Sequence, residues 1–78
     1  MDKEKKIMID EYVVRNILEM TIEITSRVLL KIIEEKYLGF MKLYGNKMAF
    51  KNKQEELECK KYFKEAYVRE FKNRNKIA

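Results

Sequence analysis

The scarcity of residues that interrupt helices constrains this chain more than any other feature of its sequence. Proline is absent, and glycine occurs only at Gly39 and Gly45. Because these two residue types mark most turns between secondary-structure elements, long helices are expected. The 78 residues fit a single domain, residues 1–78, and a domain of this size hides only about 60% of the surface that its unfolded chain exposes. The sequence therefore predicts one all-α domain with a small core.

Residues 3–38 are expected to form one long helix. Charged residues recur four positions apart along one side of it, which is typical of a solvated helical stripe. These residues are Glu11, Arg15, Glu19, Glu23 and Arg27. The opposite side is apolar and consists of Ile9, Val13, Ile17, Met20, Ile24, Val28 and Ile32. Flanking aliphatic residues make this face wider than a surface helix normally carries. Gly39, which tolerates a left-handed backbone, is expected to end the helix.

The length of this helix raises the question of what covers its apolar face. Unbroken, the helix would be about 54 Å long at roughly 1.5 Å per residue. A compact chain of this length is only about 30 Å across. We therefore expect an elongated molecule that forms a helical homodimer. The expected dimer or partner interface consists of Val13, Ile17, Met20, Ile24, Val28 and Ile32.

A break in the helix near Thr21–Ser26 is the alternative. Four of these six residues are β-branched, and Ile22-Glu23-Ile24-Thr25 alternates apolar with polar residues, as a short strand would. A ribbon-helix-helix dimer is a minor variant of this alternative, with a strand at Lys5–Ile9 and helices at Asp10–Met20 and Ser26–Leu38. The segment between its two helices, Thr21–Thr25, contains no glycine, which makes that variant less favourable.

Residues 40–52 allow two interpretations. Gly45 and Asn46 between apolar flanks could turn a β-hairpin. We favour a short helix followed by a loop, because a lone hairpin is marginally stable.

A helix over residues 53–73 is predicted next. Asn52 can accept a hydrogen bond from the backbone N–H of Glu55, as residues that precede helices often do. The apolar residues that follow have helical spacing, so that one face packs inward against the long helix. This face consists of Cys59, Tyr62, Phe63, Ala66 and Tyr67.

The residue types that most often act as catalytic bases or metal ligands are absent or occur only once. The chain has no histidine and one cysteine, Cys59, so the usual general base and the usual metal-ligand sets are absent. We expect no enzymatic activity, no cofactor and no bound metal. The longest stretch without polar residues, Tyr37–Met41, is far below the roughly 18 residues of a membrane span. No signal-peptide core follows the charged N-terminus. Together with the single cysteine, this predicts a cytoplasmic protein.

Positive charge is concentrated in the second half of the chain. Residues 1–38 carry 7 basic and 8 acidic residues, net −1, whereas residues 39–78 carry 11 and 5, net +6. Lysine-rich surfaces bind phosphate backbones by releasing counterions. The predicted nucleic-acid contacts are Lys42, Lys47, Lys51, Lys53, Lys60, Lys61 and Lys64. Four lysines of the predicted C-terminal helix fall within about 120° of one another around its axis. They are Lys60, Lys61, Lys64 and Lys72.

The sequence thus predicts a small regulatory protein that contacts the backbone of DNA or RNA. Aromatic residues of the middle segment, Phe40, Tyr44 and Phe50, could stack on exposed bases. Only Arg69 and Arg74 occur in the basic half, and arginine is the usual residue for reading bases, so backbone contacts should dominate. The alternative is a protein-protein interaction module, an adaptor or inhibitor, that uses the apolar face of the long helix. A helix lying on an anionic membrane fits residues 53–73 only loosely, because glutamates interrupt its polar side.

Overall fold

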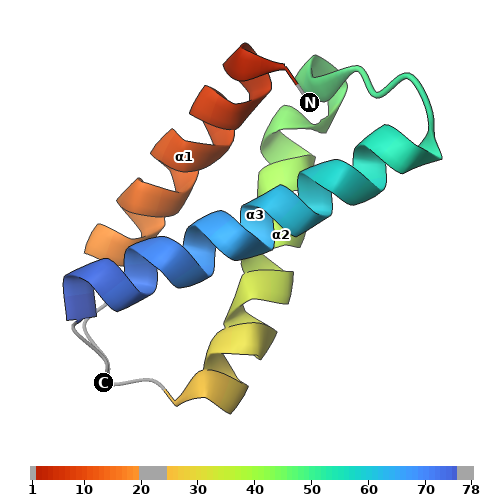
Figure 1. Ribbon diagram of the computed structural model, residues 1–78. Helices are drawn as coiled ribbons and strands as arrows, with labels where there is room; N and C mark the ends of the chain where they lie inside the picture. The colour runs from red at the N-terminus through yellow and green to blue at the C-terminus, as the bar shows by residue number, and fades with distance from the viewer. Residues whose placement is uncertain (1, 20–24, 76–78) are drawn as a thin grey trace.

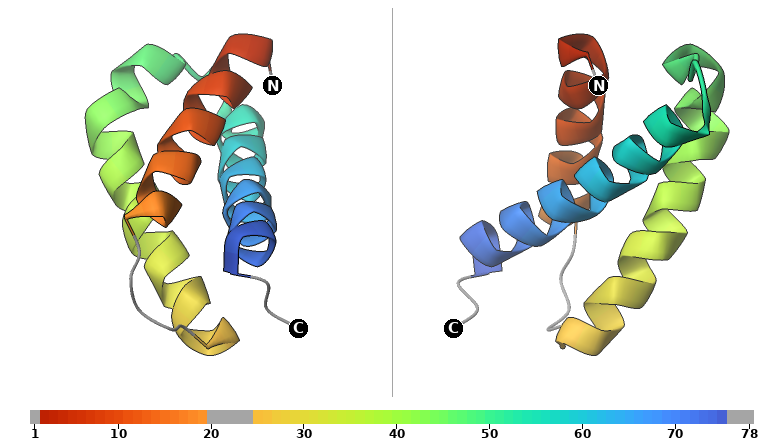
Figure 2. Two further views of the ribbon diagram at one scale, coloured as in Figure 1. Left: turned by 90° about the vertical axis from the view of Figure 1, so that its left-hand side faces the viewer. Right: turned by 45° about the vertical axis from the view of Figure 1, so that its right-hand side comes forward.

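The computed structural model describes residues 2–19 and 25–75, which form three helices (Figure 1). Helix α1 spans Lys3–Leu18, α2 spans Ser26–Met48 and α3 spans Lys53–Asn75. Helices α1 and α3 run in the same general direction, and α2 runs the opposite way (Figure 2). The expected all-helical architecture is confirmed, since these residues contain no strand.

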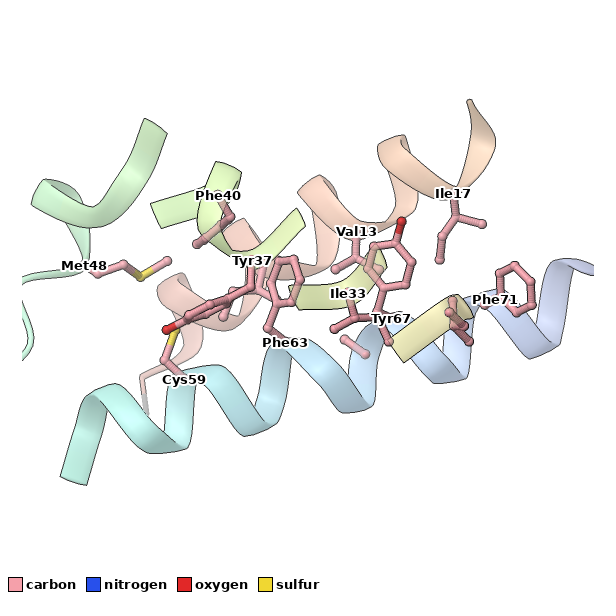
Figure 3. Close-up of a cluster of buried hydrophobic side chains, with 13 residues drawn as sticks. Val13, Ile17, Ile33, Tyr37, Phe40, Met48, Cys59, Phe63, Tyr67 and Phe71 are labelled. Carbon is pink, nitrogen blue, oxygen red and sulfur yellow. The ribbon is translucent and has the colours of Figure 1, made fainter. Parts of the chain in front are cut away.

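The core lies between the three helices and is built around Phe63 of α3 (Figure 3). The Phe63 ring centroid lies 5.3 Å from that of Tyr37 and 5.6 Å from that of Phe40, both on α2. It lies 6.1 Å from the ring of Tyr12 on α1. These spacings are typical of favourable aromatic pairs. The buried hydrophobic residues are Ile9, Val13, Ile17, Leu29, Ile33, Tyr37, Phe40, Met48, Cys59, Phe63, Ala66, Tyr67 and Phe71.

Helix α3 begins where the sequence predicts. The side chain of Asn52 accepts a hydrogen bond of 2.9 Å from the backbone N–H of Glu55, which satisfies one of the free donors at the start of the helix. The predicted face is buried at Cys59, Phe63, Ala66 and Tyr67. Tyr62 is only partly buried, and the helix continues to Asn75, two residues beyond the expected end.

The expectation of one long helix over residues 3–38 is wrong, because α1 ends at Leu18 and α2 begins at Ser26. The alternative places a break near Thr21–Ser26, and residues 21–24 of this segment lie outside the described residues. The strand proposed at Lys5–Ile9 is also wrong, since these residues belong to α1.

A physical reason for the separate helices is the position of α3. Helix α1 packs mainly on α3 of the same chain, and Ile9, Val13 and Ile17 are buried there. Burying one such side chain stabilises the fold by roughly 1.5–3 kcal/mol. The part of the expected interface that lies on α1, Val13 and Ile17, is therefore covered by α3.

Both glycines lie inside α2, and neither has a positive φ. The predicted helix end at Gly39 is therefore wrong, as are a hairpin and a separate short helix over residues 40–52. Residues 40–48 form the last part of α2. Phe40, Tyr44 and Met48 recur every four positions on the side that faces the core. Their burial outweighs the cost of about 1 kcal/mol that a glycine adds within a helix.

Helix α2 ends at a residue other than glycine. Ala49, which follows Met48, has φ 45° and ψ 56°, in the left-handed region that glycine adopts most easily. This conformation turns the chain toward α3.

Candidate nucleic-acid interface

The seven lysines predicted to contact nucleic acid are all exposed, but they fall in three places. Lys42 and Lys47 lie on α2, Lys51 precedes α3 and Lys53 is its first residue. Lys60, Lys61 and Lys64 lie further along α3. Within this last group, Lys64 lines one hollow with Lys60 and another with Lys61.

The outer side of α3 carries a row of basic side chains. Lys61, Lys64 and Lys72 line one shallow hollow there, together with Val68, Arg69 and Glu65. We call these three lysines the basic ridge. Their side chains are exposed and form no ion pair within residues 2–19 and 25–75. Lys72 was not among the predicted contacts, although its position around the helix axis already placed it with the others.

Arg69 lies in the same hollow but its charge is partly compensated. Its Nη2 is 3.4 Å from Oδ1 of Asp10, and its Nε is 3.7 Å from a carboxylate oxygen of Glu70. The arginine therefore helps to join α1 to α3, and the three lysines supply the positive charge of the hollow that forms no ion pair among the described residues.

Lys60 faces a different part of the surface. It lines a groove between α2 and α3, and its Nζ lies 5.9 Å from the ring centroid of Tyr37 on the groove floor. Lys64 lines both this groove and the hollow of the basic ridge. Lys64 thus marks the border between the two.

The lysines of α2 are separated from the basic ridge. The Nζ of Lys47 lies 5.9 Å from the ring of Tyr44, and that ring lies 6.1 Å from Tyr12 of α1. Lys47 is therefore on the α1 side of α2, whereas Lys60 is on the α3 side.

The start of α3 is held by Lys5 of α1. The Lys5 ammonium donates a hydrogen bond to Glu55 and forms an ion pair with it, and its Nζ lies 5.7 Å from the ring of Phe50. The hydrogen bond raises the pKa of Lys5 and lowers the pKa of Glu55. This contact fixes the segment that carries Lys51 and Lys53.

The expected stacking residues are less accessible than the sequence implies. Phe40 is fully buried in the core, so its predicted contact with bases is wrong. Tyr44 and Phe50 are partly buried and pack against the core. Of the three rings, only parts of Tyr44 and Phe50 are therefore accessible from outside.

The predicted dimer interface is divided by the fold. Val13 and Ile17 are buried within the subunit, Ile32 is partly buried, and Val28 is 46% exposed. Met20 and Ile24 lie outside the described residues. The large apolar side chains that are exposed come mainly from other helix faces. They are Ile7, Leu18, Val28, Leu30, Leu38, Leu43 and Leu57.

Cys59 is buried in the core, as its place on the apolar face predicts. Burial raises the pKa of its thiol, and burial raises the pKa of the neighbouring Tyr37 to about 12. The Tyr37 hydroxyl points toward Cys59 (Figure 3) and has no other polar group within hydrogen-bond distance among the described residues. Both groups are therefore neutral at physiological pH.

Neither a metal-binding cluster nor a membrane-spanning helix is found among the described residues. These residues contain no cluster of three or more histidine, cysteine, aspartate or glutamate side chains that could hold a metal ion. None of the described helices is long and apolar enough to cross a membrane. Comparisons of the chain with protein-family models, with curated proteins and with solved structures found no significant match.

Proposed function

We propose that this protein binds the backbone of a nucleic acid along the basic ridge of α3. The observation that carries the proposal is the gathering of Lys61, Lys64 and Lys72 around one hollow, where none of them forms an ion pair among the described residues. A nucleic-acid strand presents a regular row of negative charges to such a surface.

The length of the basic ridge suits several phosphates. Lys61 and Lys72 are separated by about 16 Å along the axis at roughly 1.5 Å per residue. Successive phosphates of one DNA strand are about 3.4 Å apart along its axis. The basic ridge therefore spans roughly five phosphates, of which its three lysines would neutralise some.

The residue types favour backbone contacts over base recognition. Lysine ammonium groups are compact charges on flexible stems, whereas bidentate recognition of guanine is usually made by arginine. Arg69, the arginine in the hollow, already contacts Asp10 and Glu70. We expect little dependence on base sequence and a strong dependence on salt.

A charge-reversal experiment tests the proposal. Binding of a labelled duplex oligonucleotide is measured by fluorescence anisotropy at several salt concentrations. In the K61E/K64E/K72E variant, affinity should fall by more than about tenfold, and the slope of log K against log salt should flatten. The control is K31E/K42E/K47E, which changes net charge equally but on α2, where these three lysines are exposed. Equal losses in both variants would show that only net charge matters, and would refute a site on α3.

A second candidate function is protein-protein interaction, including self-association. It is supported by Leu18, Leu38 and Leu43, each of which is at least 63% exposed. Exposed apolar side chains of this size are common singly, but contiguous patches mark interfaces. Sedimentation equilibrium at micromolar concentration distinguishes a dimer from a monomer of 9.5 kDa. A purely monomeric result would remove the homodimer from this proposal.

A further inference from the structure

The groove between α2 and α3 has an apolar floor and charged walls. Ile33 and Tyr37 of α2 and Phe63 of α3 form the floor. Leu30, which is 47% exposed, lies at the rim. The groove encloses about 320 Å³. It exists because α2 and α3 diverge away from the loop that joins them (Figure 2).

The grooves on the two sides of α1 differ from this one. The hollow between α1 and α2 encloses only about 60 Å³, because Tyr12 and Tyr44 fill it. The hollow between α1 and α3 is lined mostly by charged side chains, including Lys6, Glu58 and Glu65. Of these three hollows between helices, the α2–α3 groove therefore has the largest volume and the most apolar surface.

The spacing of the groove residues fits a helix as occupant. The lining residues of α2 follow the spacing i, i+3, i+4, i+7 and are Leu30, Ile33, Glu34 and Tyr37. Those of α3 follow i, i+3, i+4 and are Lys60, Phe63 and Lys64. The groove thus runs along about 10 Å of α2, at roughly 1.5 Å per residue. A helix with its own apolar ridge at these intervals interdigitates with such rows.

Helix α1 is itself an example of a helix that packs against α2 and α3. It lies against α2 and α3 on their other side and inserts an apolar row at intervals of four residues, Ile9, Val13 and Ile17. Beside this row, Asp10 meets Tyr62 and Arg69 of α3. An apolar row with an acidic residue at its edge is thus the pattern that this chain itself docks onto α3.

The charges of the groove specify the chemistry of its occupant. Lys60 and Lys64 stand on the α3 wall, about 6 Å apart along the helix axis. Glu34 alone stands on the α2 wall. We infer that the α2–α3 groove binds an amphipathic helix of a partner protein, whose acidic residues at i and i+4 pair with the two lysines. This inference goes beyond nucleic-acid binding, since the groove shares only Lys64 with the basic ridge.

Two synthetic helical peptides test the inference. Both are about 18 residues long, roughly five turns, with leucines at i, i+3, i+4 and i+7 and capped ends. One carries glutamates beside the leucine row at i and i+4, and the other carries lysines there. Calorimetric titration into the full chain should give a dissociation constant at least about tenfold lower for the acidic peptide. Equal affinities, or no binding of either peptide, would overturn the inference.

Three variants locate the binding site. L30D should weaken binding of the acidic peptide at least about tenfold, because it puts a charge at the apolar rim. K60E/K64E should reverse the preference, so that the lysine peptide binds better. L57D is the matched control, since Leu57 is a 54% exposed residue of α3 outside the groove. If L57D weakens binding as much as L30D, the groove is not the site.

Titration of the labelled oligonucleotide separates this inference from the proposed function. L30D should leave oligonucleotide affinity unchanged, because a leucine in the groove does not contact phosphate bound on the outer ridge. If L30D abolishes oligonucleotide binding, the groove holds nucleic acid and the inference is wrong. If K61E/K72E leaves oligonucleotide affinity unchanged while the acidic peptide binds as expected, the proposed function fails and the inference stands.

Discussion

The Tyr62 hydroxyl of α3 donates to the carboxylate of Asp10 on α1, at 3.0 Å from Oδ1 and 3.1 Å from Oδ2. Apolar packing between two helices is non-directional and tolerates sliding. A hydrogen bond to a carboxylate requires a defined distance and direction. The hydrogen bond between Tyr62 and Asp10 therefore fixes the position of α1 along α3.

Removing this hydroxyl should destabilise the fold. The Y62F variant leaves the aromatic ring in place and deprives Asp10 of a donor, which should lower the free energy of unfolding by about 1 kcal/mol. Urea unfolding followed by circular dichroism measures the change. E11Q, next to Asp10 but exposed, serves as a control and should unfold at the same urea concentration as the wild type. An unchanged midpoint for Y62F would show that the pair does not fix α1.

The two glycines of α2 should respond differently to alanine. In G45A the new Cβ would lie 3.6 Å from Cε of Met41, an ordinary contact, and the helix should gain about 0.5–1 kcal/mol. In G39A the Cβ would lie 3.3 Å from the Tyr12 hydroxyl, which must shift, so the gain should be smaller or lost. Thermal unfolding of both variants measures the difference. A larger gain for G39A would contradict the close approach of α1 to α2 at this point.

At Ala49 the reverse substitution, alanine to glycine, should stabilise the protein. Its left-handed backbone, with φ 45°, is unfavourable for a residue with a Cβ and costs nothing for glycine. The A49G variant should therefore be more stable by about 0.5–1 kcal/mol. A66G, inside α3, is the contrasting control and should be less stable, because Ala66 is buried in a regular helix. Destabilisation by A49G would indicate that α2 does not end in this conformation.

Two buried tyrosines make stability dependent on alkaline pH. Burial raises the pKa of Tyr37 and of Tyr67 to about 12, from an ordinary value of 10.0. The unfolded chain therefore ionises first, so their stabilising contribution is complete below pH 10 and is lost as pH rises toward 12. The urea concentration at the unfolding midpoint should fall over this range. The phenolate absorbance of these two residues should appear at a higher pH in the folded protein than in the unfolded chain. In Y67F the fall should be smaller, and an equal fall would point to other groups.

The C-terminal helix could be predicted because its signals are local. Asn52 marks its start within one turn, and Cys59, Phe63 and Tyr67 define its buried side by spacing alone. The same locality identified the lysines of α3 as neighbours, since positions on one helix fix their relative directions. Lys72 belongs to this set for the same reason.

The first half of the chain could not be predicted in this way. Its apolar spacing continues past Leu18, so periodicity alone gave no sign that α1 ends there. Nor does spacing reveal whether a face such as that of Val13 and Ile17 is covered by the same chain or by another. That depends on where α3 packs, which is a long-range property.

Glycine was misleading in the middle of the chain. Gly39 and Gly45 have weak helical preference, but the side chains around them face the core and hold the helix together. Tertiary packing commonly overrides propensities of this size. Because α2 extends further than expected, Lys42 and Lys47 lie on it, and the Lys47 ammonium lies over the ring of Tyr44.

The contact between α1 and α3 has a consequence for how the polypeptide is made. Asp10 and Tyr62 are 52 residues apart, and the apolar row of α1 is covered by α3, which is synthesised after both other described helices. A nascent chain leaving the ribosome must therefore carry α1 uncovered until most of α3 has emerged. Exposed apolar surface in incomplete chains is prone to aggregation. The packing of α1 in this fold is accordingly completed only after α3 has been synthesised.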